Sequence, residues 1–209
     1  MSHYFTTPDG PEKRREIGAT IWEREYTFTT ANGVFSGARL DPSTAILLRE
    51  VPPPADGARL LDLGCGYGPI AVALADHCPA SLVDAVDVNQ RALGLAAENA
   101  RRIGAGQRVR ALLPEQADPA TRYDEIWSNP PIRIGKPALH ELLLTWLPRL
   151  APTGRAVMVV GKNLGADSLA RWLEDQGYDC TRLASHKGFR VLEVRPDGAA
   201  QPVAQQPMQ

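Results

Sequence analysis

The chain has 209 residues, of which 44% are hydrophobic and 22% are charged, and its formal net charge is -1 at pH 7. This length and composition predict one soluble globular domain, and no apolar run in the sequence is long enough to span a bilayer. Cys65, Cys78 and Cys180 match neither a zinc-site spacing nor a disulfide framework, so we expect no bound metal and a cytoplasmic location. The near-neutral charge neither indicates nor excludes a basic surface for nucleic acid.

Residues 1–57 are predicted to form an N-terminal extension, the first 20 residues of which are polar and are expected to follow the surface. The β-prone segments 25–30 and 34–35 flank Ala31-Asn32-Gly33, and Asn-Gly in such a setting indicates a hairpin. Asp41-Pro42-Ser43 begins a predicted helix, which ends at the prolines of 52–54.

Residues 58–195 alternate between predicted strands and predicted helices, which is typical of an α/β fold with a Rossmann-like, mostly parallel sheet and helices on both faces. The last two strands follow each other without a helix, so one of them is expected to run antiparallel at the edge of the sheet. Residues 196–209 are rich in Pro, Gln, Ala and Gly and are predicted to be disordered. The predicted strands are 59–63, 81–88, 108–113, 124–128, 155–160, 178–183 and 189–194, and the helices are 70–77, 89–103, 137–150 and 167–176.

A glycine-rich turn, Gly64-Cys65-Gly66-Tyr67-Gly68, follows the first strand of this region. Glycines let the backbone approach a ligand, and ligands of open α/β sheets bind beyond the carboxyl ends of the strands. Asp62 is placed to hold a cationic amine, and Asp87, at the end of the next strand, to accept both hydroxyls of a ribose. A turn without a ligand and a dinucleotide site are the alternatives, but Pro69 replaces the third glycine of the dinucleotide fingerprint.

The segment Asn129-Pro130-Pro131-Ile132 follows the fourth strand. The exocyclic amine of a base is a poor nucleophile because its lone pair is delocalised into the ring. Two carbonyls, from the side chain of Asn129 and the backbone of Pro130, can accept its two N–H groups, localise the lone pair and stabilise the developing positive charge. The two motifs together predict methyl transfer from S-adenosylmethionine (SAM) to an amino nitrogen, with S-adenosylhomocysteine as product. A rigid turn without catalytic function is the alternative.

These motifs resemble those of the class I SAM-dependent methyltransferases of the small-domain group and, more closely, the RsmC-like ribosomal RNA guanine-N2 methyltransferases. The likeness rests on residues 35–36, 40–44, 62–68, 129–136 and 189–192 together with Asp87. It implies a seven-stranded sheet with a reversed last strand, and a lid over the cofactor formed by residues 35–44. It implies a catalytic segment of Asn129, Pro130, Pro131 and Ile132, and SAM contacts from Phe35, Asp41, Thr44, Asp62, Gly64, Cys65, Gly66, Gly68, Asp87, Val88, Glu115 and Asn129.

Three features depart from the family pattern. Ile132 stands where an aromatic residue often stacks on the base, and Glu115 is the candidate for the acid that contacts the adenine amine. A counterpart of the N-terminal domain that aids RNA binding in longer members is not expected. Arg133 and Lys136 are predicted to contact RNA phosphates, with solvated loop charges as the equal alternative.

The sequence therefore predicts a monomeric methyltransferase that acts on a guanine amine and has ribosomal RNA or the small ribosomal subunit as its partner. Two alternatives stay open. The acceptor could instead be a protein glutamine or a small-molecule amine, or the chain could bind SAM or RNA without turnover.

Overall fold

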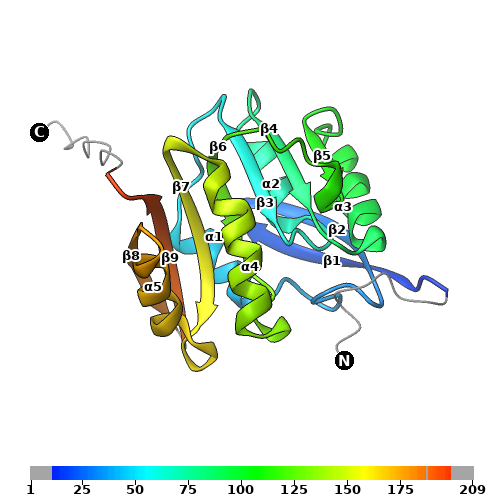
Figure 1. The fold of residues 1–209 in the computed structure, drawn as a ribbon. Helices are drawn as coiled ribbons and strands as arrows, with labels where there is room; N and C mark the ends of the chain where they lie inside the picture. Colours follow the sequence, from blue (N-terminus) through cyan, green and yellow to red (C-terminus); the bar gives the residue numbers. More distant parts are fainter. Residues whose placement is uncertain (1–10, 187, 199–209) are drawn as a thin grey trace, which may run out of the picture.

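A seven-stranded sheet in the order β5-β4-β3-β6-β7-β9-β8 forms the centre of the molecule (Figure 1). The computed structural model describes residues 11–186 and 188–198. The strands are β1 (Arg14–Ile21), β2 (Arg24–Ala31), β3 (Arg59–Leu63), β4 (Leu82–Val86), β5 (Val109–Leu112), β6 (Tyr123–Ser128), β7 (Leu150–Gly161), β8 (Tyr178–His186) and β9 (Phe189–Pro196). The helices are α1 (Pro42–Glu50), α2 (Pro69–His77), α3 (Gln90–Arg102), α4 (Lys136–Trp146) and α5 (Ala166–Asp175).

The sheet is mostly parallel, as predicted. Strands β3 to β7 pair in parallel, whereas β9 lies between β7 and β8 and is antiparallel to both. The chain therefore places its last strand inside the sheet and leaves β8 at the edge. This confirms the Rossmann-like α/β fold with an antiparallel last strand.

Helices cover both faces of the sheet and define two apolar cores (Figure 1). One core lies under α1, α2 and α3 and includes the hairpin residues Ile17, Tyr26 and Phe28. The other lies under α4 and α5 and includes Trp146 and Leu173. Because both faces of β3 are buried, its sequence reads as the continuous apolar run that suits a central parallel strand.

The predicted N-terminal hairpin is wrong in its position. Segment 25–30 does lie in a strand, β2, but its partner is β1 and the turn falls at Trp22-Glu23. Both turn residues have positive φ, 45° and 68°, as the two central residues of a type I′ hairpin turn require. The indole of Trp22 packs edge-on against Trp127 and His77, so tertiary packing selects this turn over Asn32-Gly33. Likewise, the expected surface segment 1–20 contains most of β1.

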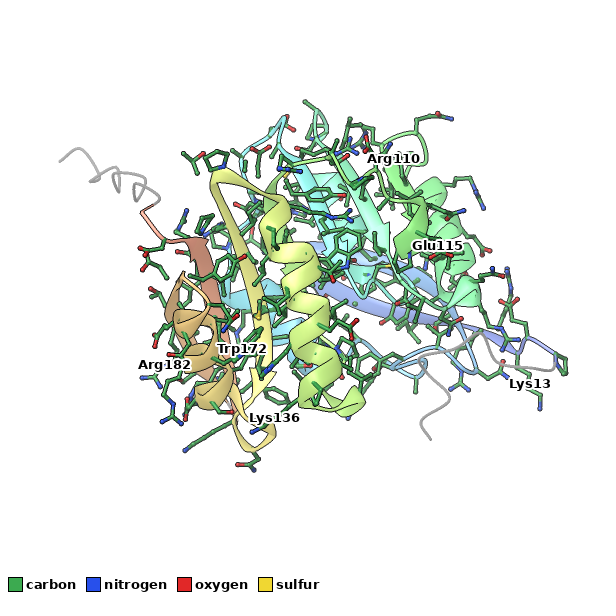
Figure 2. The ribbon with its side chains drawn as sticks, in the orientation of Figure 1. Lys13, Arg110, Glu115, Lys136, Trp172 and Arg182 are labelled. Atoms are coloured by element: carbon green, nitrogen blue, oxygen red, sulfur yellow. The ribbon has the colours of Figure 1, made fainter. Side chains whose placement is uncertain are left out.

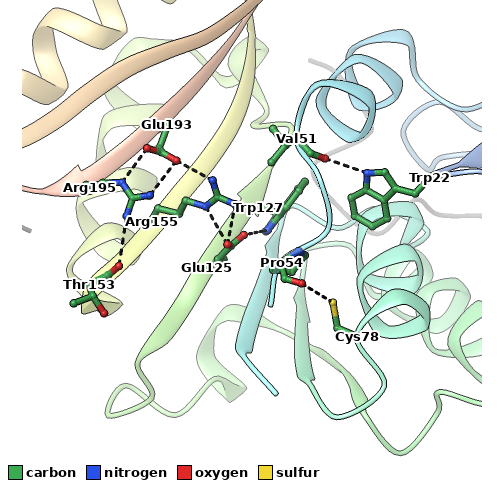
Figure 3. A network of polar contacts seen from close by, with 10 residues as sticks. All are labelled: Trp22, Val51, Pro54, Cys78, Glu125, Trp127, Thr153, Arg155, Glu193 and Arg195. Carbon is green, nitrogen blue, oxygen red and sulfur yellow. Dashed lines mark hydrogen bonds and ion pairs between the residues drawn. The ribbon is translucent and has the colours of Figure 1, made fainter. Parts of the chain in front are cut away.

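A polar network joins the amino-terminal halves of β6 and β7 to the carboxyl-terminal half of β9 (Figure 3). The guanidinium of Arg155 pairs with Glu125 and with Glu193, both at 2.9 Å, and Arg195 pairs with Glu193 at 2.9 Å. Cross-strand pairs of this kind favour one register between neighbouring strands. The network thereby supports the register of these three strands from the end of the sheet opposite the cavity described below.

The predicted helix 137–150 is too long and the predicted strand 155–160 too short, because α4 ends at Trp146 and β7 begins at Leu150. Strand β9 ends at Pro196, and residues 199–209 lie outside the described part of the chain, so the predicted disordered tail stays a prediction. Within residues 11–186 and 188–198, no helix is both long and apolar enough to cross a membrane.

Candidate active site

A cavity of about 330 Å³ opens at the carboxyl ends of the central parallel strands. Residues on the connections after β3, β4 and β5 line one part of it, and residues after β6 together with α4, β7 and β9 line another. Its walls are Phe35, Asp41, Ser43, Leu63, Gly64, Gly66, Val86, Asp87, Val88, Pro114, Asn129, Pro130, Pro131, Ile132, Leu142, Trp146, Val159, Gly161 and Phe189. The two sequence motifs therefore meet in one cavity.

The three glycines of the turn serve two different purposes. Gly64 and Gly66 line the cavity with positive φ, 77° and 55°. A Cβ on Gly66 would meet no atom within 4 Å, and one on Gly64 would meet only the ring of Pro131, at 3.9 Å. Gly68 instead packs against α3, where its Cβ would lie 2.9 Å from that of Ala96. The first two glycines leave room for a ligand, whereas the third allows close helix packing.

The carboxyl of Asp62 is fully buried and only half satisfied. Its Oδ2 accepts a hydrogen bond from the Ala71 backbone at 2.9 Å, but its Oδ1 has no partner among the described residues. Burial raises the pKa of Asp62 to about 8. A buried polar atom without a partner carries a free-energy cost that a bound donor can remove, but Asp62 does not itself line the cavity, so its contact with the amine of SAM stays a prediction.

Asp87 ends β4 and lines the cavity. Its two carboxyl oxygens accept from the backbone N–H groups of Gly66 and Asn89, each at 2.9 Å. Burial raises the pKa of Asp87, and these backbone donors partly offset that effect. The carboxylate is thereby held at the strand end where a ribose would bind, with lone pairs left to accept hydroxyl groups.

The segment Gly33 to Leu40 lies between β2 and α1 and brings Phe35 to the cavity. The side chain of Asn89 donates to the Gly33 carbonyl at 2.9 Å, which ties this segment to the connection after β4. Phe35 and Val88 both line the cavity and are 48% and 51% exposed. Large apolar side chains that remain exposed beside a cavity are typical of a ligand site, and these two would cover the flat adenine of SAM.

The side chain of Asn129 is held by the N-terminal end of α1. Its Nδ2 donates to Asp41 Oδ1 at 3.0 Å and to Thr44 Oγ1 at 2.9 Å. No described residue donates a hydrogen bond to Asn129 Oδ1. The amide nitrogen is therefore fully used, and the carbonyl oxygen is left for a ligand.

The two prolines form a tight turn between β6 and the short helical turn Ile132–Ile134. Pro131 has φ -75° and ψ 69°, and the Pro130 carbonyl accepts from the Ile132 N–H at 2.8 Å, which defines an inverse γ-turn. A carbonyl has two lone pairs, so Pro130 retains one acceptor position. Because both ring φ angles are fixed, the loop keeps this shape without a ligand.

An apolar wall completes the cavity on the side of α4 and β9. It consists of Ile132, Leu142, Trp146, Val159 and Phe189. Leu142, Trp146 and Val159 were not among the site residues predicted from the sequence. The four-residue spacing of Leu142 and Trp146 on α4 is the signal that was available, since such residues share one helix face.

Five residues predicted to bind SAM do not line the cavity: Thr44, Asp62, Cys65, Gly68 and Glu115. The Cys65 thiol is buried, and burial raises its pKa well above the ordinary value, so it is not a nucleophile. Glu115 is exposed near α3 (Figure 2), and its neighbour Pro114 lines the cavity instead. Their roles as SAM contacts stay predictions.

Of the two predicted RNA contacts, Lys136 is not among the residues that line the cavity. Lys136 is exposed at the start of α4, on the side of the molecule that also carries Trp172 (Figure 2). The side chain of Arg133 lies outside what the structure describes. Both roles stay predictions.

This fold and this cavity define a class I SAM-dependent methyltransferase. Residues 25–193 match the family described as methyltransferase small domain, and the chain belongs to that family.

Relatives of known sequence agree with this assignment. The chain is 29% identical to the uncharacterized protein YbxB of Bacillus subtilis, over 92% of this chain and 98% of that protein. It is 33% identical to the ribosomal RNA small subunit methyltransferase C of Pseudomonas aeruginosa, over 90% of this chain and 56% of that protein. It is 51% identical to the release factor glutamine methyltransferase of Bordetella pertussis, over 66% of this chain and 56% of that protein. The chain thus spans about half the length of these two named methyltransferases.

Among solved structures, the fold is similar to that of the 16S rRNA N2 G1207 methyltransferase (RsmC) of T. thermophilus, in complex with AdoMet and guanosine. The TM-score is 0.73 with 24% sequence identity, over 90% of this chain and 52% of that chain. This likeness confirms the fold.

Proposed function

We propose that this protein transfers a methyl group from SAM to the exocyclic N2 amine of a guanine in ribosomal RNA. The observation that supports the proposal most is the orientation of Asn129, whose carbonyl oxygen accepts no hydrogen bond from the residues that the structure describes. An exocyclic amine has two N–H groups, and Asn129 Oδ1 and the second lone pair of the Pro130 carbonyl are two acceptors on one rigid turn.

These acceptors explain how the protein would promote the reaction. SAM, when bound, supplies an electrophilic methyl group. Asn129 and Pro130 hold both N–H groups of the acceptor, which turns the nitrogen lone pair out of conjugation with the ring. Positive charge then grows on that nitrogen, and the two carbonyl dipoles stabilise it without reorganising. The chain needs no strong base, because the methylated cation is itself acidic.

The walls of the cavity favour a flat, largely apolar acceptor such as a purine base. Trp146, Ile132 and Phe189 line it with aromatic or aliphatic surface. The relative from P. aeruginosa is named as a ribosomal RNA methyltransferase, and the T. thermophilus enzyme of similar fold was solved with guanosine. The first likeness supports ribosomal RNA as the substrate, and the second supports guanine as the acceptor base.

Cations at the rim support a nucleic-acid substrate. Lys136 and Lys162 follow β6 and β7 at the same edge of the sheet, and both side chains are exposed. Neither lysine forms an ion pair within the part of the chain that the structure describes. Such lysines can contact phosphates and so position an RNA strand without reading its sequence.

A second candidate is N-methylation of a protein glutamine. The nitrogen of a side-chain amide is also conjugated and also carries two N–H groups, so the same pair of carbonyls can hold it. The identity of 51% to the release factor glutamine methyltransferase of B. pertussis favours this candidate.

The test is to incubate the protein with radiolabelled SAM and, in separate reactions, ribosomal RNA, small subunits, a purified release factor and an RNA-depleted extract. We expect label in N2-methylguanosine after nuclease digestion, and a strongly reduced but measurable rate of labelling with the Asn129→Ala variant. The exposed Thr145→Ala variant on α4 is the matched control and should retain activity. Label confined to glutamine or to small molecules would refute the guanine proposal.

A further inference from the structure

We infer that Asp41 and Thr44 are positioning residues for methyl transfer, because they hold the Asn129 amide in the orientation that presents its carbonyl oxygen to the acceptor. This inference rests on the proposed function, in which Asn129 binds the acceptor amine. It differs from the sequence prediction, which placed Asp41 and Thr44 among the SAM contacts.

The contacts that carry the inference join segments far apart in the chain. The Asn129 Nδ2 atom has two hydrogens, and it lies 3.0 Å from Asp41 Oδ1 and 2.9 Å from Thr44 Oγ1. These residues are 88 and 85 positions away in the sequence. The N-terminal end of α1 therefore satisfies both amide N–H groups.

The chemistry of the two partners fixes which way the amide faces. An ionised carboxylate only accepts hydrogen bonds, so Asp41 can face the amide nitrogen of Asn129 but not its oxygen. A hydroxyl can donate or accept, so Thr44 alone would tolerate either orientation. Asp41 therefore selects the orientation, and Thr44 takes the second N–H.

Asp41 is itself held rigidly. It is the N-cap of α1, and its Oδ1 also accepts from the backbone N–H groups of Ser43 at 2.9 Å and Thr44 at 3.1 Å and from the Ser43 hydroxyl. A negative charge on one side of an amide polarises it and adds negative charge to the carbonyl oxygen on the other side. In the proposed reaction, positive charge develops on the acceptor nitrogen that this oxygen contacts. Asp41 would therefore stabilise the transition state electrostatically, in addition to orienting the amide.

Variants of Thr44 can distinguish the positioning of Asn129 from an effect on cofactor binding. Asp41 lines the cavity, whereas Thr44 is 4% exposed and does not. The first experiment therefore compares Thr44→Val, which keeps the shape and removes the hydroxyl, with Thr44→Ser, which keeps the hydroxyl. We expect Thr44→Val to lower kcat about tenfold, the value of one hydrogen bond, with the KM for SAM nearly unchanged, and Thr44→Ser to restore kcat.

A double variant shows whether Thr44 acts through Asn129. In an Asn129→Ala background, Thr44→Val should cause no further loss, because the group that Thr44 positions is already absent. A further loss of similar size would mean that Thr44 acts elsewhere and would overturn its assignment.

The charge of Asp41 is tested by Asp41→Asn. Asparagine is also a good N-cap, so α1 should persist, and its amide oxygen can take the place of Asp41 Oδ1 toward Asn129 while the negative charge is lost. We expect kcat to fall and the thermal midpoint to change little. An Asp41→Asn enzyme with wild-type kcat would refute the electrostatic contribution.

A readout without turnover distinguishes this inference from the proposed function. The side-chain N–H signals of Asn129 in a 15N-labelled protein are identified by their loss in Asn129→Ala. We expect them to shift and to exchange faster with water in Thr44→Val, but not in Thr44→Ser. Unchanged signals in Thr44→Val would overturn the inference, even for an enzyme that methylates guanine. Shifted signals without any guanine label would refute the proposed function alone.

Discussion

The affinity for SAM should rise steeply with pH on the acid side of neutrality, because the Asp62 carboxyl must lose a proton to hold a cationic amine. One oxygen of this buried carboxyl has no partner, and burial raises its pKa to about 8. The ionised fraction is then about 1 in 100 at about pH 6 and about 1 in 11 at about pH 7. The Kd for SAM should therefore fall about ninefold over that interval, which corresponds to ~1.3 kcal/mol.

Isothermal titration calorimetry at several pH values measures this directly. Titrations in two buffers with different ionisation enthalpies should show that nearly one proton is released per SAM bound. The pH range of these titrations should end near pH 8, because the α-amino group of SAM then begins to lose its own proton. The Asp62→Asn variant, which keeps the shape of the side chain, should bind weakly and without this slope. A wild-type Kd independent of pH, or the same slope in Asp62→Asn, would refute the assignment of Asp62 to the amine.

The same carboxyl makes folding stability change in the opposite direction. Its folded-state pKa lies above its ordinary value of 3.8, so the folded protein binds this proton more tightly than the unfolded chain. The resulting stability is complete below about pH 4 and is lost as the pH rises through about 8. Asp62→Asn should consequently be more stable than the wild type above about pH 8, as thermal unfolding of the two ligand-free proteins would show. A wild type that is the more stable at that pH would contradict the buried, half-satisfied state of Asp62.

Three other perturbations test separate parts of the structure. Gly68→Ala should destabilise the fold by about 1–3 kcal/mol in denaturant unfolding, because φ is 85° and the new Cβ would lie 2.9 Å from that of Ala96. Phe35→Ala should raise the KM for SAM severalfold and leave kcat at saturation nearly unchanged, whereas an unchanged KM would remove Phe35 from the site. Lys136→Ala combined with Lys162→Ala should weaken RNA binding and reduce the slope of log K against log salt by about 1–2, and an unaltered slope would place the RNA elsewhere.

The sheet could be predicted from the sequence because its strands are buried on both faces. Strands β3, β4 and β7 appear as short apolar runs, and helices separate most of them, so a parallel sheet follows from the pattern. The position of β9 between β7 and β8 depends on pairings across the sheet and has no local signature.

The hairpin could not be placed in the same way. Asn32-Gly33 is a good turn by local chemistry, and Gly33 does have a φ of 72°, but the chain that follows leads to Phe35 at the cavity rather than to a strand. The hairpin turn at Trp22-Glu23 depends on contacts of Trp22 with Trp127 and His77, which lie more than 50 positions away in the sequence. Long-range packing of an aromatic side chain thus outweighs the local preference.

The site shows the same division between local and long-range signals. Gly64, Asp87 and Asn129 could be predicted to lie together because each directly follows a strand, and the carboxyl ends of parallel strands meet at one edge. The function inferred for Thr44 was not found, because its hydrogen bond to Asn129 depends on how α1 packs against the sheet.

The choice of acceptor and the chemistry of transfer reside on different parts of this fold. Asn129 and Pro130 belong to a rigid turn at the end of β6, and any conjugated amine with two N–H groups can use their carbonyls. The surface that meets the rest of the acceptor comes from α4 and β9, through Trp146 and Phe189, and Ile132 adds only an aliphatic face. Under the proposed function, we therefore expect sequence changes on α4 and β9 to alter the preference between a guanine and a glutamine without disturbing the turn.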